Sequence, residues 1–181
     1  WAVGTNAGML DTGTIANTTY HIHLIHRSDT GVSDILASTS ATAPTMPTSY
    51  DYRRRIGSIL RESAAIVAFT QTGDYFVRTT AVLDVNATNP GTAAVTRTLS
   101  VPTGVTVWPI LNVTVNAGAG NNLAYLSDLS VTDVAASETA APLGLVWAIS
   151  GGLDGTHVGG GIRTNTSAQL RSRMFFSDGS T

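Results

Sequence analysis

The 181-residue sequence contains neither cysteine nor lysine, and these two absences exclude several kinds of site. Without cysteine the chain has no disulfide, no thiolate zinc site and no cysteine nucleophile. Without lysine it has neither the lysine of a phosphate-binding P-loop nor a Schiff-base lysine. The chemistry left to the chain is that of arginines, carboxylates, histidines, hydroxyls and aromatic rings.

Charge and long apolar runs are also scarce. Only 12% of the residues are charged, and the formal net charge is −2. General attraction to nucleic acid or to an anionic membrane surface is therefore not expected. The longest apolar run, residues 140–149, is much shorter than the roughly 20 residues that span a bilayer. We expect no nucleic-acid partner and no membrane insertion.

Glutamate occurs only at Glu62 and Glu138, in a chain dominated by Thr, Val, Ala, Ser, Gly and Asn. Helices normally draw on Glu, Lys, Gln, Leu and Met, whereas the stiff side chains of Thr and Val suit a pleated surface. No segment longer than two turns shows convincing helical periodicity, and about ten strand-like runs alternate with turn residues. This pattern predicts an all-β fold, an antiparallel β-sandwich of jelly-roll type.

One hairpin and one loop are marked clearly near the start of the chain. Residues 18–27 and 32–38 read as two strands joined by a turn that contains Gly31, which can take a positive φ. The segment that follows contains Pro44 and Pro47. Proline cannot donate to a central ladder, so a loop or an edge excursion is expected there.

The length fits one domain, and we expect residues 1–181 to form a single β-sandwich domain. Because the sequence begins at Trp1 rather than Met, it is expected to be a piece of a longer or processed polypeptide. With no disulfide, its stability outside a cell would come from packing or from association of subunits.

Three of the four histidines fall within the stretch "HIHLIH". His21 and His23 are two residues apart, so on a strand their side chains leave the same face. Such a pair is a weak metal signal without an assured third ligand, although pairs could converge on the axis of a trimer. The favoured interpretation is that Tyr20, Ile22 and Leu24 face the core and the His pair faces solvent or a neighbouring subunit. We expect no structural metal and no cofactor.

Residues 50–56, "YDYRRRI", mix aromatic and guanidinium side chains that could stack on sugars or bases. On a strand, Arg53 and Arg55 share one face and Arg54 takes the other, so the three charges do not form one patch. The alternative is a polar strand with ion pairs between strands or subunits. The candidate ligand-binding residues of this stretch are Tyr50, Tyr52 and Arg54.

Glycine is densest in residues 151–161, "GGLDGTHVGGG". The stretch lacks the G-x-G-x-x-G order between a strand and a helix. It is either a loop that lets backbone approach a ligand or a tight turn with a crowded strand. Its candidate ligand-binding residues are Asp154 and His157. No G-x-S-x-G elbow occurs and no carboxylate pair stands out, so no catalytic residue is predicted.

An ordered set of short motifs runs through residues 19–58. A Tyr-His strand with Leu-Ile is followed by a Ser-x-Ser tract, a Thr-Ala-Pro-x-x-Pro-x-x-Tyr stretch and Arg-Arg-Ile-Gly-Ser. This order resembles a segment common in tail-fibre and related virion proteins of tailed bacteriophages, as do residues 100–105 and 163–173. The matching pieces are Tyr20-His21, Leu24-Ile25, residues 38–40, Thr42-Ala43-Pro44, Pro47, Tyr50 and residues 54–58. His23 and His26 depart from the pattern.

The resemblance implies a β-rich virion appendage domain of the C-terminal type, assembled as a homotrimer and often placed at the distal end of a fibre. Its implied function is non-enzymatic: attachment to a host-surface receptor, a glycan or a protein, beside other virion proteins. The alternative is a structural module that decorates a capsid or tail and has no receptor of its own. A polysaccharide depolymerase is less favoured, because such enzymes usually need a long solenoid body.

Overall fold

The structure is a computed structural model of the 181-residue chain. Its residues within the described part form strands, turns and bends, without a helix. No helix in this part is therefore long and apolar enough to cross a membrane. All pairs of named strands are antiparallel, and the predicted all-β antiparallel fold is confirmed for these residues. The structure describes residues 9–88, 90–116, 122–137, 139, 144–148, 153–158 and 161–175.

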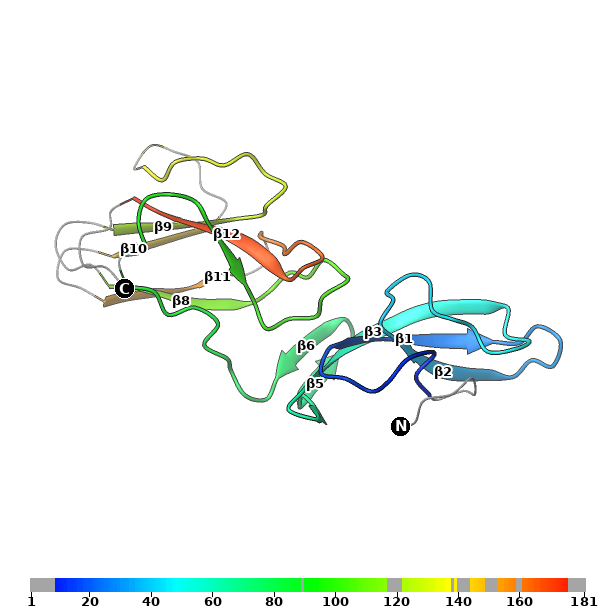
Figure 1. Ribbon diagram of the computed structural model, residues 1–181. Coiled ribbons are helices and arrows are strands. Elements are labelled where there is room, and N and C mark those ends of the chain that lie inside the picture. The colour runs from blue at the N-terminus through cyan, green and yellow to red at the C-terminus, as the bar shows by residue number, and fades with distance from the viewer. Residues whose placement is uncertain are drawn as a thin grey trace. The chain divides into compact units, whose positions relative to one another are not determined.

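The chain divides into two compact units, Trp1–Ala81 and Val82–Thr181, and Figure 1 shows the sheets of each. The named strands pair only with strands of their own unit. The expectation of a single sandwich domain over residues 1–181 stays a prediction.

The first unit contains a four-stranded sheet in the order β2-β1-β3-β4 and a separate two-stranded sheet of β5 and β6. Strand β1 lies in the interior of the larger sheet, with β2 on one side and β3 on the other (Figure 1). Both of its edges are hydrogen-bonded to neighbouring strands. Only the two faces of β1 can therefore be covered by other segments or exposed to solvent. The strands are β1 (Thr19–His26), β2 (Ser33–Ser38), β3 (Tyr52–Glu62), β4 (Ala65–Ile66), β5 (Phe69–Thr72) and β6 (Tyr75–Arg78).

The hairpin of β1 and β2 is closed by Gly31, whose φ is 72° and whose N–H donates to the carbonyl oxygen of Arg27 at 2.9 Å. A Cβ at Gly31 would meet no atom within 4 Å. The turn therefore requires glycine for its positive φ and not for close packing. This hairpin and the strand-free loop that contains Pro44 and Pro47 are both confirmed.

The chain before β1 covers one half of one face of the larger sheet. Leu10 forms a short parallel bridge with Ala37 on β2, and the hydroxyl of Tyr20 accepts a hydrogen bond from the N–H of Ala16 at 2.8 Å. Burial of these side chains supplies the hydrophobic stabilisation of this half. The cluster consists of Leu10, Tyr20 and Ala37, with Ile15, Ile22 and Ile59 packed against it.

The second unit contains a four-stranded sheet in the order β10-β9-β12-β7 and a two-stranded sheet of β11 and β8. Most of these pairs join distant parts of the sequence; for example, β12 pairs with both β7 and β9. The strands are β7 (Val95–Thr98), β8 (Leu111–Asn116), β9 (Asn122–Ser127), β10 (Gly144–Ala148), β11 (Leu153–Val158) and β12 (Gln169–Met174).

The core of the second unit lies between its two sheets. Val115 on β8 packs with Ala124 on β9 and Met174 on β12. Val113, also on β8, contacts this cluster and a second cluster as well, so the two sheets pack on each other along β8. The second cluster consists of Leu99, Leu126, Ile162 and Leu170, with Val101, Leu111 and Val113 against it.

The described residues form twelve strands, whereas the sequence predicts about ten. The difference comes from short strands such as β4, which has two residues. Two residues carry no alternation of apolar and polar side chains, so no pattern marks them. Their pairing depends on the partner strand, here β3.

Candidate functional site

One end of the β2-β1-β3 sheet has a face that the rest of the described first unit leaves exposed. Two neighbouring rungs of paired residues cross the three strands there. Residues two apart on a strand point to the same side, so the two rungs form a grid of six side chains. We call this grid the open face. It comprises Ile35, Leu24 and Arg54 in one rung and Ser33, His26 and Tyr52 in the next.

The open face carries large apolar groups in contact with solvent. Tyr52 is 62% exposed, Ile35 48% and Leu24 42%. Ile56, beside the grid, is half-exposed as well. Scattered exposed apolar residues are normal, but a group of them on adjacent strands is typical of a binding surface.

Polar contacts hold the aromatic end of the open face. His26 and Ser33 face each other across β1 and β2, with 2.9 Å between Nδ1 and Oγ. The imidazole of His26 lies against the ring of Tyr52, with centroids 6.2 Å apart and planes tilted by 46°. This distance is within the range of aromatic pairs. Tyr52 is thus supported from one side while most of its surface remains accessible.

Arg54 differs from every other arginine of the chain. It has no hydrogen bond and no ion pair with any described residue. Its neighbours on the open face, Leu24 and Tyr52, are an aliphatic and an aromatic residue and include no carboxylate. The nine arginines that do bind an oxygen of the chain are Arg27, Arg53, Arg55, Arg61, Arg78, Arg97, Arg163, Arg171 and Arg173.

A β-bulge determines which arginine points to the open face. The pairing of β1 with β3 slips by one residue, because Ile22 pairs with Gly57 but His23 pairs with Arg55. The slip leaves Ile56 as the extra residue of the bulge. In an unslipped register Leu24 would face Arg55 and not Arg54. The prediction that Arg54 lies on the face opposite its two arginine neighbours is confirmed by the register.

Hydrogen bonds at the β1–β2 turn fix the end of the open face. Asp51, just before β3, accepts from the N–H of Ser28 at 3.0 Å and from its hydroxyl. These bonds from Ser28 lower the pKa of the Asp51 carboxyl. Within the turn, Arg27 donates to both carboxylate oxygens of Asp29, at 3.0 and 2.7 Å, and this hydrogen bonding lowers the pKa of Asp29. The turn is thereby tied to the start of β3.

His21 and His23 lie on the opposite face of β1, and each is only 1% exposed. The interpretation that this pair faces solvent or a neighbouring subunit is wrong. Tyr20 is buried as expected, and Ile22 is partly buried, but Leu24 is exposed. The strand therefore has a covered polar face and a second face that is covered only over its first half.

Hydrogen bonds explain how two imidazoles are accommodated in the interior. Nδ1 of His21 lies 2.8 Å from the hydroxyl of Ser58, and Nε2 of His23 lies 3.1 Å from the carbonyl oxygen of Ser40. Burying a polar group is costly unless it is hydrogen-bonded, and these partners offset most of that cost. Nδ1 of His23 is buried without a partner among the described residues.

The loop between β2 and β3 lies against this covered face. Asp11 fastens it, because one carboxylate oxygen accepts from the hydroxyl of Ser38 at 2.7 Å and from the N–H of Thr45 at 2.8 Å. Arg53 donates to the carbonyl oxygen of Thr42 at 3.3 Å. These hydrogen bonds connect the loop to β2 and to β3, and the three segments surround the two histidines.

The surroundings of His21 favour its neutral form. Burial lowers the pKa of His21 to about 4, helped by the nearby charge of Arg55 and by His23. Among the described residues no group of three or more His, Asp or Glu side chains could hold a metal ion. The pair thus has no third ligand in this part of the chain, and the expectation that it binds no structural metal stays a prediction.

The other sequence candidates lie in different parts of the chain. Tyr50 is partly buried in the loop before β3, while Tyr52 and Arg54 lie together on the open face. Asp154 and His157 lie on β11 of the second unit, and their side chains are outside the described part. Residues 153–158 of the glycine-rich stretch form a strand, as the turn-and-strand interpretation predicts.

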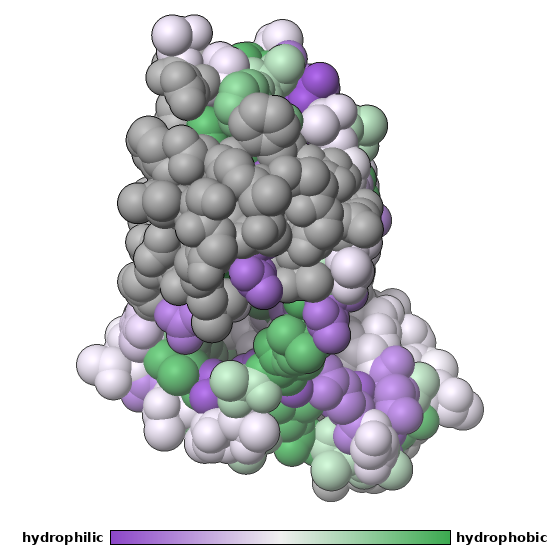
Figure 2. Space-filling model, turned by 90° about the vertical axis from the view of Figure 1, so that its left-hand side faces the viewer, coloured by the Kyte–Doolittle hydropathy of each residue, from purple (hydrophilic) through white to green (hydrophobic). Residues whose placement is uncertain are grey.

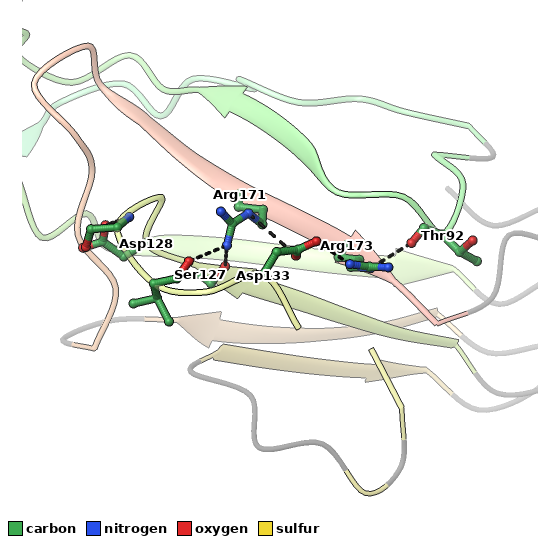
Figure 3. Close-up of polar contacts among 8 residues, drawn as sticks. Thr92, Ser127, Asp128, Asp133, Arg171 and Arg173 are labelled. Carbon is green, nitrogen blue, oxygen red and sulfur yellow. Dashed lines mark hydrogen bonds and ion pairs between the residues drawn. The ribbon is translucent and has the colours of Figure 1, made fainter. Parts of the chain in front are cut away.

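A network of arginines and aspartates joins the loop after β9 to β12 in the second unit (Figure 3). Asp133 bridges two arginines, Arg171 at 3.7 Å and Arg173 at a shorter distance. Arg171 also donates to the carbonyl oxygen of Val131 at 2.9 Å, and Arg173 donates to that of Thr92 at 3.0 Å. The opposite charges pair with one another, so the network ties the loop to β12 and is interpreted as structural.

Asp128 belongs to the same loop and is buried. Burial by itself would raise the pKa of its carboxyl, but hydrogen bonds from Ser130 and Arg163 outweigh this and lower it. The ion pair with Arg163 spans 2.6 Å. Asp128 is therefore a charged structural anchor at neutral pH.

The sequence interpretation missed four members of the open face: Leu24, His26, Ser33 and Ile35. Leu24 was assigned to the core because it alternates with Tyr20 and Ile22. The sequence feature that does indicate the open face is the pair Tyr52 and Arg54, which are two residues apart on a predicted strand.

No protein-family model, no curated protein and no solved structure matches the chain. The open face is therefore interpreted from its own residues and from their surroundings in the sheet.

Proposed function

We propose that the chain is a non-enzymatic module of a bacteriophage virion appendage, a tail fibre or its receptor-binding tip, and that it attaches to a glycan on the host surface. The observation that carries the proposal is the open face. It presents an exposed tyrosine, an arginine without a partner among the described residues, and apolar neighbours on a well-connected sheet. All six residues fall within residues 19–58, the segment that resembles tail-fibre proteins. Aromatic rings and guanidinium groups suit recognition of sugars and of anions.

The proposal includes an assembly. We expect a jelly-roll-like β-sandwich that associates as a homotrimer on the virion, outside the cell. Hydrophobic side chains lie at the surface among hydrophilic ones (Figure 2), and such exposure supports burial between subunits. The strongly exposed examples away from the open face include Ile66, Tyr75, Leu83 and Trp108.

A module that decorates a capsid or tail is the second candidate function. The same exposed apolar residues favour it, because they suit contact with other virion proteins. It differs from the first candidate in having no host receptor of its own.

Binding to host polysaccharide tests the proposal. The fluorescently labelled chain is incubated with a panel of bacterial strains and with polysaccharide isolated from each. Saturable binding at micromolar concentration to at least one strain, competed by that strain's polysaccharide, is the expected result. Absence of binding to every strain favours the decorating module, and release of reducing ends from a bound polysaccharide shows a depolymerase instead.

A further inference from the structure

We propose that the open face recognises an acidic sugar, a uronic-acid unit of the host polysaccharide, with Arg54 pairing with the carboxylate and Tyr52 stacking on the sugar ring. The inference rests on the proposed function, because it takes a surface glycan to be the receptor. The inference adds the chemical class of the sugar and assigns the residues that bind it.

The charge of Arg54 is the first argument. The other nine arginines bind oxygen atoms of the chain, and five of them form ion pairs with carboxylates. Arg54 alone keeps all its guanidinium donors free of described protein partners. A guanidinium matches a carboxylate with two parallel hydrogen bonds, which is the strongest pairing that this side chain makes. The open face is therefore complementary to an anion.

The position of Tyr52 is the second argument. Tyr52 and Arg54 are two residues apart on β3, which separates their side chains by about 7 Å along the strand. The contact with His26 supports Tyr52 from one side. A sugar ring stacked on the exposed tyrosine would extend its substituents toward Arg54. Stacking on Tyr52 together with pairing to Arg54 favours a sugar ring that carries a carboxylate over a free small anion.

The remaining members of the open face suit the rest of such a sugar. Leu24 and Ile35 offer an apolar floor for the C–H groups of a pyranose. Nδ1 of His26 is engaged by Ser33, which leaves Nε2 to meet a sugar hydroxyl. A phosphate-rich polymer such as nucleic acid fits less well, because its affinity comes from many cations and the open face has one.

A second copy of the chain is a poorer occupant. Packing of the open face on itself would place two copies of Arg54 in one interface, with no carboxylate among the six grid residues to pair with them. Contact with a different surface of another copy would need a carboxylate ready to pair with Arg54. Four carboxylates of the described part are already bound to arginines: Asp29, Glu62, Asp128 and Asp133. Asp34, Asp74 and Asp84 form no such pair with a described residue, so the oligomeric mass of the Arg54 variant serves as the test of a contact between copies.

The test uses the polysaccharide of a strain that the intact chain binds. Its carboxylates are reduced chemically to primary alcohols, which removes the charge and keeps the sugar backbone. We expect the dissociation constant of the chain to rise at least about tenfold on reduction. We expect Arg54→Gln to weaken binding to the untreated polymer by a similar factor and to change binding to the reduced polymer little. Tyr52→Ala should weaken binding to both.

Arg53→Gln is the matched control, because Arg53 is the adjacent residue on the other face of β3. It should bind both polymers as the unchanged chain does, and circular dichroism should show that all variants remain folded. Equal binding of untreated and reduced polymer, or an unaffected Arg54→Gln variant, overturns the inference and leaves the proposed function intact. A change of oligomeric mass in Arg54→Gln overturns it in favour of a subunit contact. Failure of the chain to bind any polysaccharide contradicts both proposals.

Discussion

His21 lies where a positive charge is unfavourable, and this makes the stability of the first unit depend on pH. Its pKa is about 4 in the folded chain, whereas a histidine in an unfolded chain titrates near pH 6.5. Between these two values the unfolded chain binds more protons, so the free energy of unfolding falls as the pH falls. The loss begins near pH 6.5, is complete below about pH 4 and amounts to at most a few kcal/mol.

Urea unfolding at several pH values between 7.5 and 4 measures this effect. His21→Asn cannot take up the proton, so the free energy of unfolding of this variant should depend less on pH than that of the unchanged chain. The comparison uses the slope with pH and not the absolute stability, because asparagine is smaller than the imidazole and packs differently. Parallel curves for the two proteins would show that His21 does not titrate as described.

The residue scale also shows where a sequence is informative and where it is not. Tyr52 and Arg54 could be nominated, because their two-residue spacing places them on one side of any strand. The sequence could not show whether the side chains of His21 and His23 are buried, because both faces of β1 carry apolar side chains. What covers the histidines is a loop whose partner atoms include the carbonyl oxygen of Ser40, and a backbone oxygen leaves no mark in the sequence.

At the scale of elements, Asp133 holds the loop after β9 to β12. Asp133→Asn removes the countercharge of Arg171 and Arg173 and should lower the free energy of unfolding by about 1 kcal/mol. The matched control is Asp29→Asn, which breaks an exposed ion pair within a turn and should cause no measurable change. Urea titration of the three proteins checks this, and equal stability of all three would contradict a structural role for the network.

Leu170 tests the core between the two sheets of the second unit. It is buried in the cluster with Leu99, Leu126 and Ile162. Leu170→Ala should cost about 2–5 kcal/mol, because truncation leaves a cavity that neighbours fill only in part. Leu24→Ala makes the same chemical change on the open face and should cost less than about 1 kcal/mol. Comparable losses in the two variants would mean that Leu24 is buried in solution.

Hairpins could be predicted from the sequence, and long-range pairings could not. The turn at Gly31 and the alternation on either side mark β1 and β2 locally. By contrast, β12 pairs with β7 across some 75 residues, as in the hydrogen bond from Arg97 to Ser172. The sequence of neither strand indicates which strand it pairs with, because the pairing depends on the packing of the whole unit.

At the scale of the whole molecule, exposed hydrophobic residues predict association. Light scattering at micromolar concentration should return about three times the chain mass of 18.8 kDa, the value for a homotrimer. Burial of side chains such as Leu83, which is strongly exposed in the single chain, is the physical reason. A mass near that of one chain would contradict the trimer.

The most direct measurement for the account is hydrogen–deuterium exchange, followed by mass spectrometry, with and without the polysaccharide of a strain that the chain binds. If the open face is the receptor site, protection should appear in peptides that cover β1, β2 and the first half of β3, around Leu24 and Arg54. The loop that covers His21 and His23 should change little, because it lies against the other face. Protection confined to residues 153–158 or to the second unit at large would contradict the assignment of binding to the open face.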